Sequence, residues 1–113
     1  MTVLERYNSA LETRAEAMRA EAAAAKARGD ERGHSIGLMK ANMLGDMLRQ
    51  LGRVDHTGIR PGILDSEIGL MTRQAASHEA KGDFDAADRA RVKAETIRFA
   101  LETLRKLEAE GDE

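Results

Sequence analysis

The chain has 113 residues, of which 42% are hydrophobic and 34% are charged, and its formal net charge is -2. This length suits one domain with one modest core, and the composition favours a helix-rich globular fold over a disordered chain. The mildly acidic balance argues against wholesale electrostatic binding of nucleic acid, so DNA is not expected as a partner. No cysteine is present, which excludes disulfides, thiolate zinc sites and cysteine nucleophiles.

The N-terminal residues give no targeting signal. The chain is charged from Glu5 onward and contains no apolar run of signal-peptide length, and no window approaches the ~20 apolar residues of a membrane span. We therefore expect a cytoplasmic protein that does not enter the membrane.

Hydrophobic periodicity predicts a first helix over about residues 2–28. Its apolar positions recur at spacings of three or four, at Leu4, Tyr7, Leu11, Ala15, Met18, Ala22 and Ala25. Gly29 can then adopt a left-handed helix cap, and the Asp30 side chain can accept hydrogen bonds from the first amides of a following helix. The chain is predicted to reverse at this pair, which gives a first hairpin over about residues 2–51.

The second helix of that hairpin is predicted to be the least rigid one, because Gly33, Gly37 and Gly45 each cost about 1 kcal/mol relative to alanine. The residues expected on its core-facing side are Ile36, Met39, Met43, Met47 and Gln50 or Leu51.

Glycines and the single proline predict a linker over residues 52–62. Asp65 or Ser66 can cap a third helix, which ends at a second Gly-Asp pair, Gly82 and Asp83. The apolar positions expected on this helix are Leu64, Ile68, Met71, Ala75 and His78. A fourth helix completes a second hairpin over about residues 63–109, and the acidic tail 110–113 is expected to fray.

The two predicted hairpins resemble each other when superposed without gaps at an offset of 53, where eleven of 41 residue pairs are identical. The identical pairs include both residues of each Gly-Asp turn. Convergent patterning of two antiparallel hairpins explains this match as well as a duplication does. In either case, two amphipathic hairpins bury their faces best against each other, which predicts a single all-α domain, 1–113, packed as a four-helix bundle-like arrangement.

No residue pattern predicts catalysis, a metal or a cofactor. Glu31 and His34 have the E-x-x-H spacing of di-iron bundles, but Ala87 replaces the histidine in the second half. The acidic cluster Asp83, Asp85 and Asp88 lacks the spacing of a calcium loop and is interpreted as favourable charge at a helix N-terminus.

One local excess of positive charge surrounds the predicted linker. Arginine forks suit phosphates, so these residues are candidate contacts to tRNA or another phosphate. A solvated loop with ordinary counter-charges is the simpler interpretation of the same residues. The candidates are Arg49, Arg53, His56, Arg60 and, on the third helix, Arg73.

Three segments in order resemble the GatB/YqeY family: VLERYNSAL, then GDERGHSIGLMKANM, then ILDSEIGLMTRQAASHEAKGDFDAADRARVKAE. Lys40-Ala41 and the run 83–95 are the most similar positions. The chain departs from the family in its longer first helix, its linker richer in glycine and arginine, and its lack of the usual C-terminal small domain.

Free-standing YqeY-like proteins resemble the helical tail of the B subunit of tRNA-dependent amidotransferases. The resemblance therefore implies a non-catalytic accessory domain, with tRNA or an amidotransferase-type protein as its partner.

A different function fits the methionines of the second helix. Met39, Met43 and Met47 are adaptable apolar side chains, as found at promiscuous binding surfaces. The alternative prediction is thus a protein-interaction module or a homo-oligomeric scaffold, with a homodimer formed through this helix.

Overall fold

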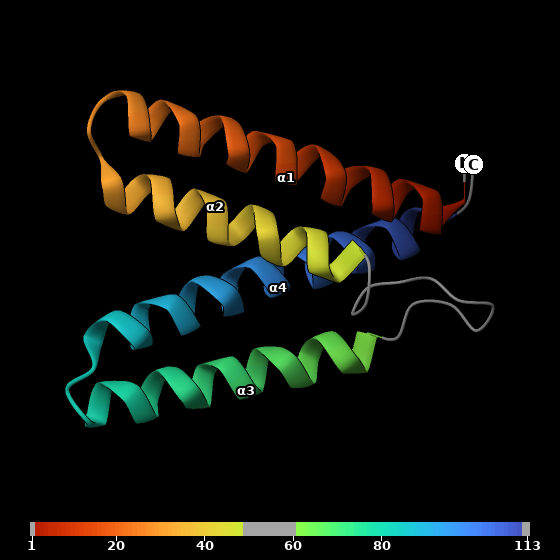
Figure 1. Cartoon of the computed structure of the whole chain (residues 1–113). Coiled ribbons are helices and arrows are strands. Elements are labelled where there is room, and N and C mark those ends of the chain that lie inside the picture. Colours follow the sequence, from red (N-terminus) through yellow and green to blue (C-terminus); the bar gives the residue numbers. More distant parts are fainter. Residues whose placement is uncertain (1, 49–60, 112–113) are drawn as a thin grey trace.

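The computed structural model describes residues 2–48 and 61–111. This part of the chain forms four helices and no strand: α1 (Val3–Ala27), α2 (Glu31–Asp46), α3 (Pro61–Ala80) and α4 (Phe84–Glu110). Figure 1 shows that α1 and α2 form one antiparallel hairpin, that α3 and α4 form a second, and that both turns lie at the same side of the molecule. The predicted all-α class and the two packed hairpins are confirmed.

The two hairpin turns have the same backbone geometry. Gly29 and Gly82 adopt φ angles of 80° and 79°, in the left-handed region that favours glycine. The Gly29 N–H donates to the Lys26 carbonyl at 3.1 Å, and the Gly82 N–H donates to the Glu79 carbonyl at 3.0 Å. The similarity of the two halves therefore extends from sequence to individual hydrogen bonds.

The predicted aspartate caps are confirmed in both turns. Asp30 accepts a hydrogen bond from the Gly33 N–H at 2.9 Å, and Asp83 accepts one from the Ala86 N–H at 3.2 Å. Each bond satisfies an amide that the first turn of a helix leaves without a partner.

The predicted start of the third helix is wrong. α3 begins at Pro61, so Asp65 and Ser66 lie inside the helix, and residues 61 and 62 belong to it instead of to the linker. Proline is well suited to a first helical position because the amide it lacks would have no partner there.

The predicted fraying of the acidic tail is wrong for Glu110 and Gly111, while residues 112–113 lie outside the described residues. α4 continues through Glu110, and Gly111 caps it by donating its N–H to the Leu107 carbonyl at 3.0 Å. The Arg6 side chain on α1 forms an ion pair with Glu110 and donates to the Gly111 carbonyl at 2.9 Å. This contact holds the end of α4 against the start of α1.

The face of α2 that packs against its neighbours differs from the predicted one. Gly37, Ala41 and Leu44 are buried, whereas Ile36, Met39 and Met43 are only half-buried, although Met43 still packs against the core. Met47, which follows α2 directly, is fully buried as predicted, and Gln50 and Leu51 lie outside the described residues. Small side chains let α2 approach α1 closely: a Cβ atom at Gly37 would lie 2.8 Å from the Ala22 Cβ.

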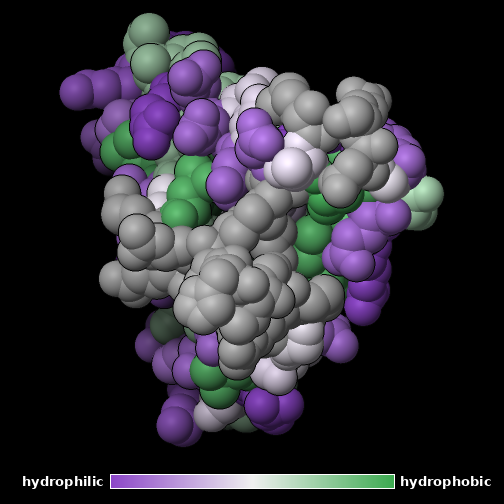
Figure 2. Space-filling model, turned by 90° about the vertical axis from the view of Figure 1, so that its right-hand side faces the viewer, coloured by the Kyte–Doolittle hydropathy of each residue, from purple (hydrophilic) through white to green (hydrophobic). Residues whose placement is uncertain are grey.

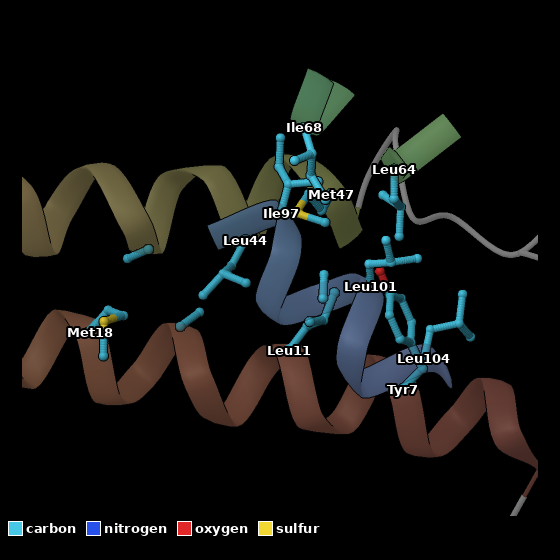
Figure 3. Packing of buried hydrophobic residues seen from close by; sticks show 13 residues of the cluster. Tyr7, Leu11, Met18, Leu44, Met47, Leu64, Ile68, Ile97, Leu101 and Leu104 are labelled. Atoms are coloured by element: carbon cyan, nitrogen blue, oxygen red, sulfur yellow. The ribbon is translucent and has the colours of Figure 1, made fainter. Parts of the chain in front are cut away.

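All four helices contribute to one hydrophobic core, which Figure 3 shows from close by. Its largest fully buried side chains include Tyr7 and Leu11 on α1, Met47 directly after α2, Leu64 on α3 and Ile97 on α4. Seen from the side at which α2 ends and α3 begins, the described hydrophobic residues show only as separated patches among hydrophilic ones (Figure 2).

Helix α4 joins the two hairpins, because it packs against α3 on one side and against α2 and α1 on the other. The molecule measures 45 × 34 × 21 Å, and its smallest dimension matches two layers of helices. In Figure 1 the hairpins cross near the end of α2 and diverge toward their turns. None of the described helices is both long enough and apolar enough to cross a membrane.

Candidate functional site

The divergence of the two hairpins leaves an open cleft of about 540 Å³ between the first halves of α2 and α4. Ile36 and Met39 on α2 and Val92 on α4 provide its apolar lining, and all three are half-buried. We call this space the α2–α4 cleft. Its remaining lining residues are polar or charged: Glu31, Arg32, Ser35, Asp85, Asp88 and Arg89.

An ion pair spans the α2–α4 cleft from one hairpin to the other. The Arg32 guanidinium donates to Asp88 at 2.6 Å. This hydrogen bond is the main reason why the pKa of Asp88 is lowered and that of Arg32 is raised. Both side chains are well exposed, so the pair positions the two walls but adds little to stability.

The other charged side chains of the cleft differ in whether they form an ion pair. Arg89 donates to Asp85 one turn away on α4 at 2.5 Å. Glu31 is exposed at the start of α2 and forms no ion pair with any described residue. Since Arg32 and Arg89 each have a carboxylate partner, Glu31 is the charge left to attract a cation.

The cleft continues along α2 as a second groove of about 400 Å³ that shares Ser35 and Met39 with it. Leu38, Met43 and Asp46 extend the α2 side of this groove, and Lys93 lines it from α4. Together the two spaces follow α2 from residue 31 to residue 46, which is about 22 Å at 1.5 Å per residue.

A large exposed side chain adjoins the cleft at its turn end. Phe84, the first residue of α4, is 64% exposed. It lies one helical turn before Asp88 and two before Val92, and residues four apart are neighbours on a helix surface. Phe84 therefore lies on the same face of α4 as two residues that line the cleft, Asp88 and Val92, although it is not itself part of the lining.

The cleft was only partly foreseen from the sequence. The methionine-rich second helix was a candidate partner surface, and Met39 and Met43 do reach the surface, whereas Met47 is buried in the core. The contribution of α4 was missed, because the sequence gives no sign that Val92 faces α2. The same α4 segment was interpreted only as a charged helix start.

The candidate metal pair has other contacts. His34 is half-buried, and its Nδ1 donates to the Ala22 carbonyl at 3.0 Å, which ties α2 to α1. Glu31 lies at the cleft instead. Within residues 2–48 and 61–111, no three histidine, aspartate or glutamate side chains gather in a metal-binding group.

Four of the five candidate phosphate contacts, Arg49, Arg53, His56 and Arg60, lie outside the described residues. Arg73 is exposed on α3, with Gly69 one turn before it. The structure therefore places one of the five residues and does not test whether they form one surface.

The phosphate-contact hypothesis makes its own prediction. Changing Arg53 and Arg60 together to glutamate is expected to weaken tRNA binding, and to reduce the slope of log affinity against log salt by about two. Filter binding over a salt series measures both quantities. Unchanged tRNA affinity in this variant, or no binding by the native chain at low salt, would contradict the hypothesis.

Comparison with known proteins adds no relative: no family model matches this chain, and neither a curated protein nor a solved structure matches it. The resemblance to the GatB/YqeY family stays a prediction from the sequence.

Proposed function

We propose that the protein is a non-catalytic helical accessory module that binds an amphipathic helix of a partner protein in the α2–α4 cleft. The observation that carries the proposal is the apolar surface of Ile36, Met39 and Val92, which is left accessible between two helices although the core beside it is closely packed. Accessible apolar clefts with polar rims are typical of binding sites.

The shape of the space favours a helix as the occupant. A groove about 22 Å long, bounded by α2 along its length, accommodates about four turns of helix. Met39 and Met43 lie one turn apart along it. Helices bind such grooves through apolar side chains at matching spacings, and methionine adapts its shape to them.

The charge of the rim indicates the chemistry of that helix. Glu31 has no ion-pair partner within the described residues, so the occupant is expected to carry a lysine or arginine near it. Such a pair at the edge contributes orientation more than affinity. The GatB/YqeY resemblance suggests an amidotransferase-type protein as the source of the helix.

The test compares two exposed apolar side chains. Phe84→Ala removes an exposed aromatic ring beside the cleft, and Leu70→Ala removes an exposed aliphatic side chain from α3, where no part of the cleft lies. After affinity recovery and mapping of the partner segment, its synthetic peptide is expected to bind Phe84→Ala about tenfold more weakly than the native chain. Leu70→Ala is expected to bind as the native chain does.

Equal loss in both variants would contradict the proposal, as would recovery of a partner whose binding is unaffected by Met39→Glu. Sedimentation of the native chain tests the other possible occupant of the cleft, a second copy of this chain. A dimer that Met39→Glu dissociates would assign the cleft to a second copy and replace the proposed partner helix.

A further inference from the structure

A second and smaller cavity is lined by residues of α1, α2 and α4, none of which lines the cleft. Its volume is about 80 Å³, which compares with ~30 Å³ for one water molecule in the liquid. Met18 and Leu44 give it an apolar floor, and both belong to the buried core. Arg14, Lys40 and Glu95 bring charge to its walls.

The Arg14 guanidinium is held on an aromatic ring. Its central carbon lies 5.1 Å from the centre of the Phe99 ring, within the range of a cation–π contact. Stacking uses the face of the guanidinium and leaves the N–H groups at its edge available for an acceptor.

Lys40 supplies a second cation from a different helix. Its side chain is half-buried, and neither Lys40 nor Arg14 forms an ion pair with a described residue. The flexible lysine stem and the stacked arginine therefore present two positive groups, from α2 and α1, to one small space.

We propose that this cavity binds a phosphate group. Its size admits one small polyatomic anion, and two cations on separate walls suit an anion with several acceptor oxygens better than a chloride ion. The apolar floor strengthens their attraction by excluding water from one side. Binding of phosphate here is independent of a partner helix in the α2–α4 cleft.

Glu95 limits the affinity of the site. Its carboxylate reduces the formal charge of the lining to one positive charge, since Arg14 and Lys40 are the only other ionised residues among those that line the cavity. The carboxylate can accept a hydrogen bond from a protonated phosphate oxygen, but it also repels the anion. Removing this charge is therefore expected to strengthen binding.

The second hairpin does not repeat the site. At the offset of 53, Lys40 corresponds to Lys93 and Met18 to Met71, but Glu67 stands in place of Arg14. One of the two cations is thus replaced by an anion, so the second hairpin is not expected to bind phosphate at the corresponding position.

The test is a titration of backbone amide chemical shifts at constant ionic strength, with sodium phosphate and, separately, glycerol 3-phosphate as probes. Saturable shifts are expected around Arg14, Lys40 and Phe99. Lys40→Met and Arg14→Gln are each expected to weaken binding about tenfold, as loss of a charge-assisted hydrogen bond implies, and Glu95→Gln is expected to strengthen it. Arg19→Gln, which removes an exposed α1 cation outside the cavity, serves as the control and is expected to bind like the native chain.

Tighter binding of glycerol 3-phosphate would identify an esterified phosphate as the natural ligand, and tighter binding of inorganic phosphate would identify the free ion. The proposal is overturned if neither probe gives saturable shifts, if Lys40→Met binds as well as Arg19→Gln, or if Glu95→Gln weakens binding.

Discussion

Replacing Gly37 with alanine is expected to lower the free energy of unfolding by about 1–3 kcal/mol, the usual cost of an overpacked interior. The added Cβ atom would lie 2.8 Å from the Ala22 Cβ and 3.0 Å from the Met18 carbonyl oxygen. Neither neighbour can move without shifting the backbone of α1. The strain is expected to outweigh the roughly 1 kcal/mol that alanine gains over glycine in a helix.

Gly69→Ala provides the matched control for this change. Gly69 also lies inside a helix, but the nearest atom to an added Cβ there is the Arg73 Nη1 at 3.3 Å, the end of a flexible side chain. This variant is expected to be more stable than the native chain by up to about 1 kcal/mol. Urea unfolding followed by circular dichroism measures both variants. A stabilised Gly37→Ala would show that α1 and α2 are not in close contact.

Stability is expected to fall as the pH rises from 10 toward 12, because of Tyr7. This side chain is fully buried, and burial raises the pKa of its hydroxyl from 10.0 to about 12. The folded state therefore holds the phenol proton more tightly than the unfolded state does. The contribution of Tyr7 to the free energy of unfolding is fully present below pH 10.0, the pKa in the unfolded chain. It is lost as the pH rises through the folded-state pKa, and the free energy of unfolding falls by up to about 1.4 kcal/mol per pH unit.

Tyr7 is the only tyrosine and the chain has no tryptophan, so phenolate absorbance reports this one group. The absorbance is expected to rise only near pH 12 or together with unfolding. The Tyr7→Phe variant separates the effect of Tyr7 ionisation from that of other groups that titrate at alkaline pH. Between pH 10 and 12, this variant is expected to lose less stability than the native chain does. Ionisation near pH 10 in the folded protein would contradict the burial of Tyr7.

At neutral pH, Tyr7→Phe is expected to be as stable as the native chain or more so, by up to about 1 kcal/mol. The Tyr7 hydroxyl has no hydrogen-bond partner among the described residues. The variant therefore removes a polar group without breaking a bond. Thermal unfolding at pH 7 measures the difference, and a large destabilisation would show that the hydroxyl is hydrogen-bonded in solution.

The hairpins and their turns could be predicted because their signals are local. Gly29 and Asp30 lie next to each other in the sequence and act on the turn that contains them. The same holds for Gly82 and Asp83. The end of α4 could not be predicted in this way, because it depends on Arg6 at the other end of the chain.

The packed face of α2 was mispredicted for a different reason. Hydrophobicity favours Ile36, Met39 and Met43 as core residues, but the close approach of α1 to α2 at Gly37 buries a face that carries small residues instead. Small residues allow the closest approach, so they decide which face is buried. Ile36 and Met39 are thereby left lining the α2–α4 cleft. That cleft depends on the angle between two hairpins, which no local pattern specifies.

The proposal that the α2–α4 cleft binds a partner helix is tested most directly by site-specific photocrosslinking. The chain has no cysteine, so Ser35→Cys in the cleft and Ser77→Cys on α3 each give a single attachment point for a photoreactive group. Both serines are exposed, and only Ser35 lines the cleft. In extract, Ser35→Cys is expected to crosslink to one partner through a helical segment of that protein, and Ser77→Cys is expected to give no such product. The same crosslinked protein from both positions, or none from Ser35→Cys, would contradict the proposal.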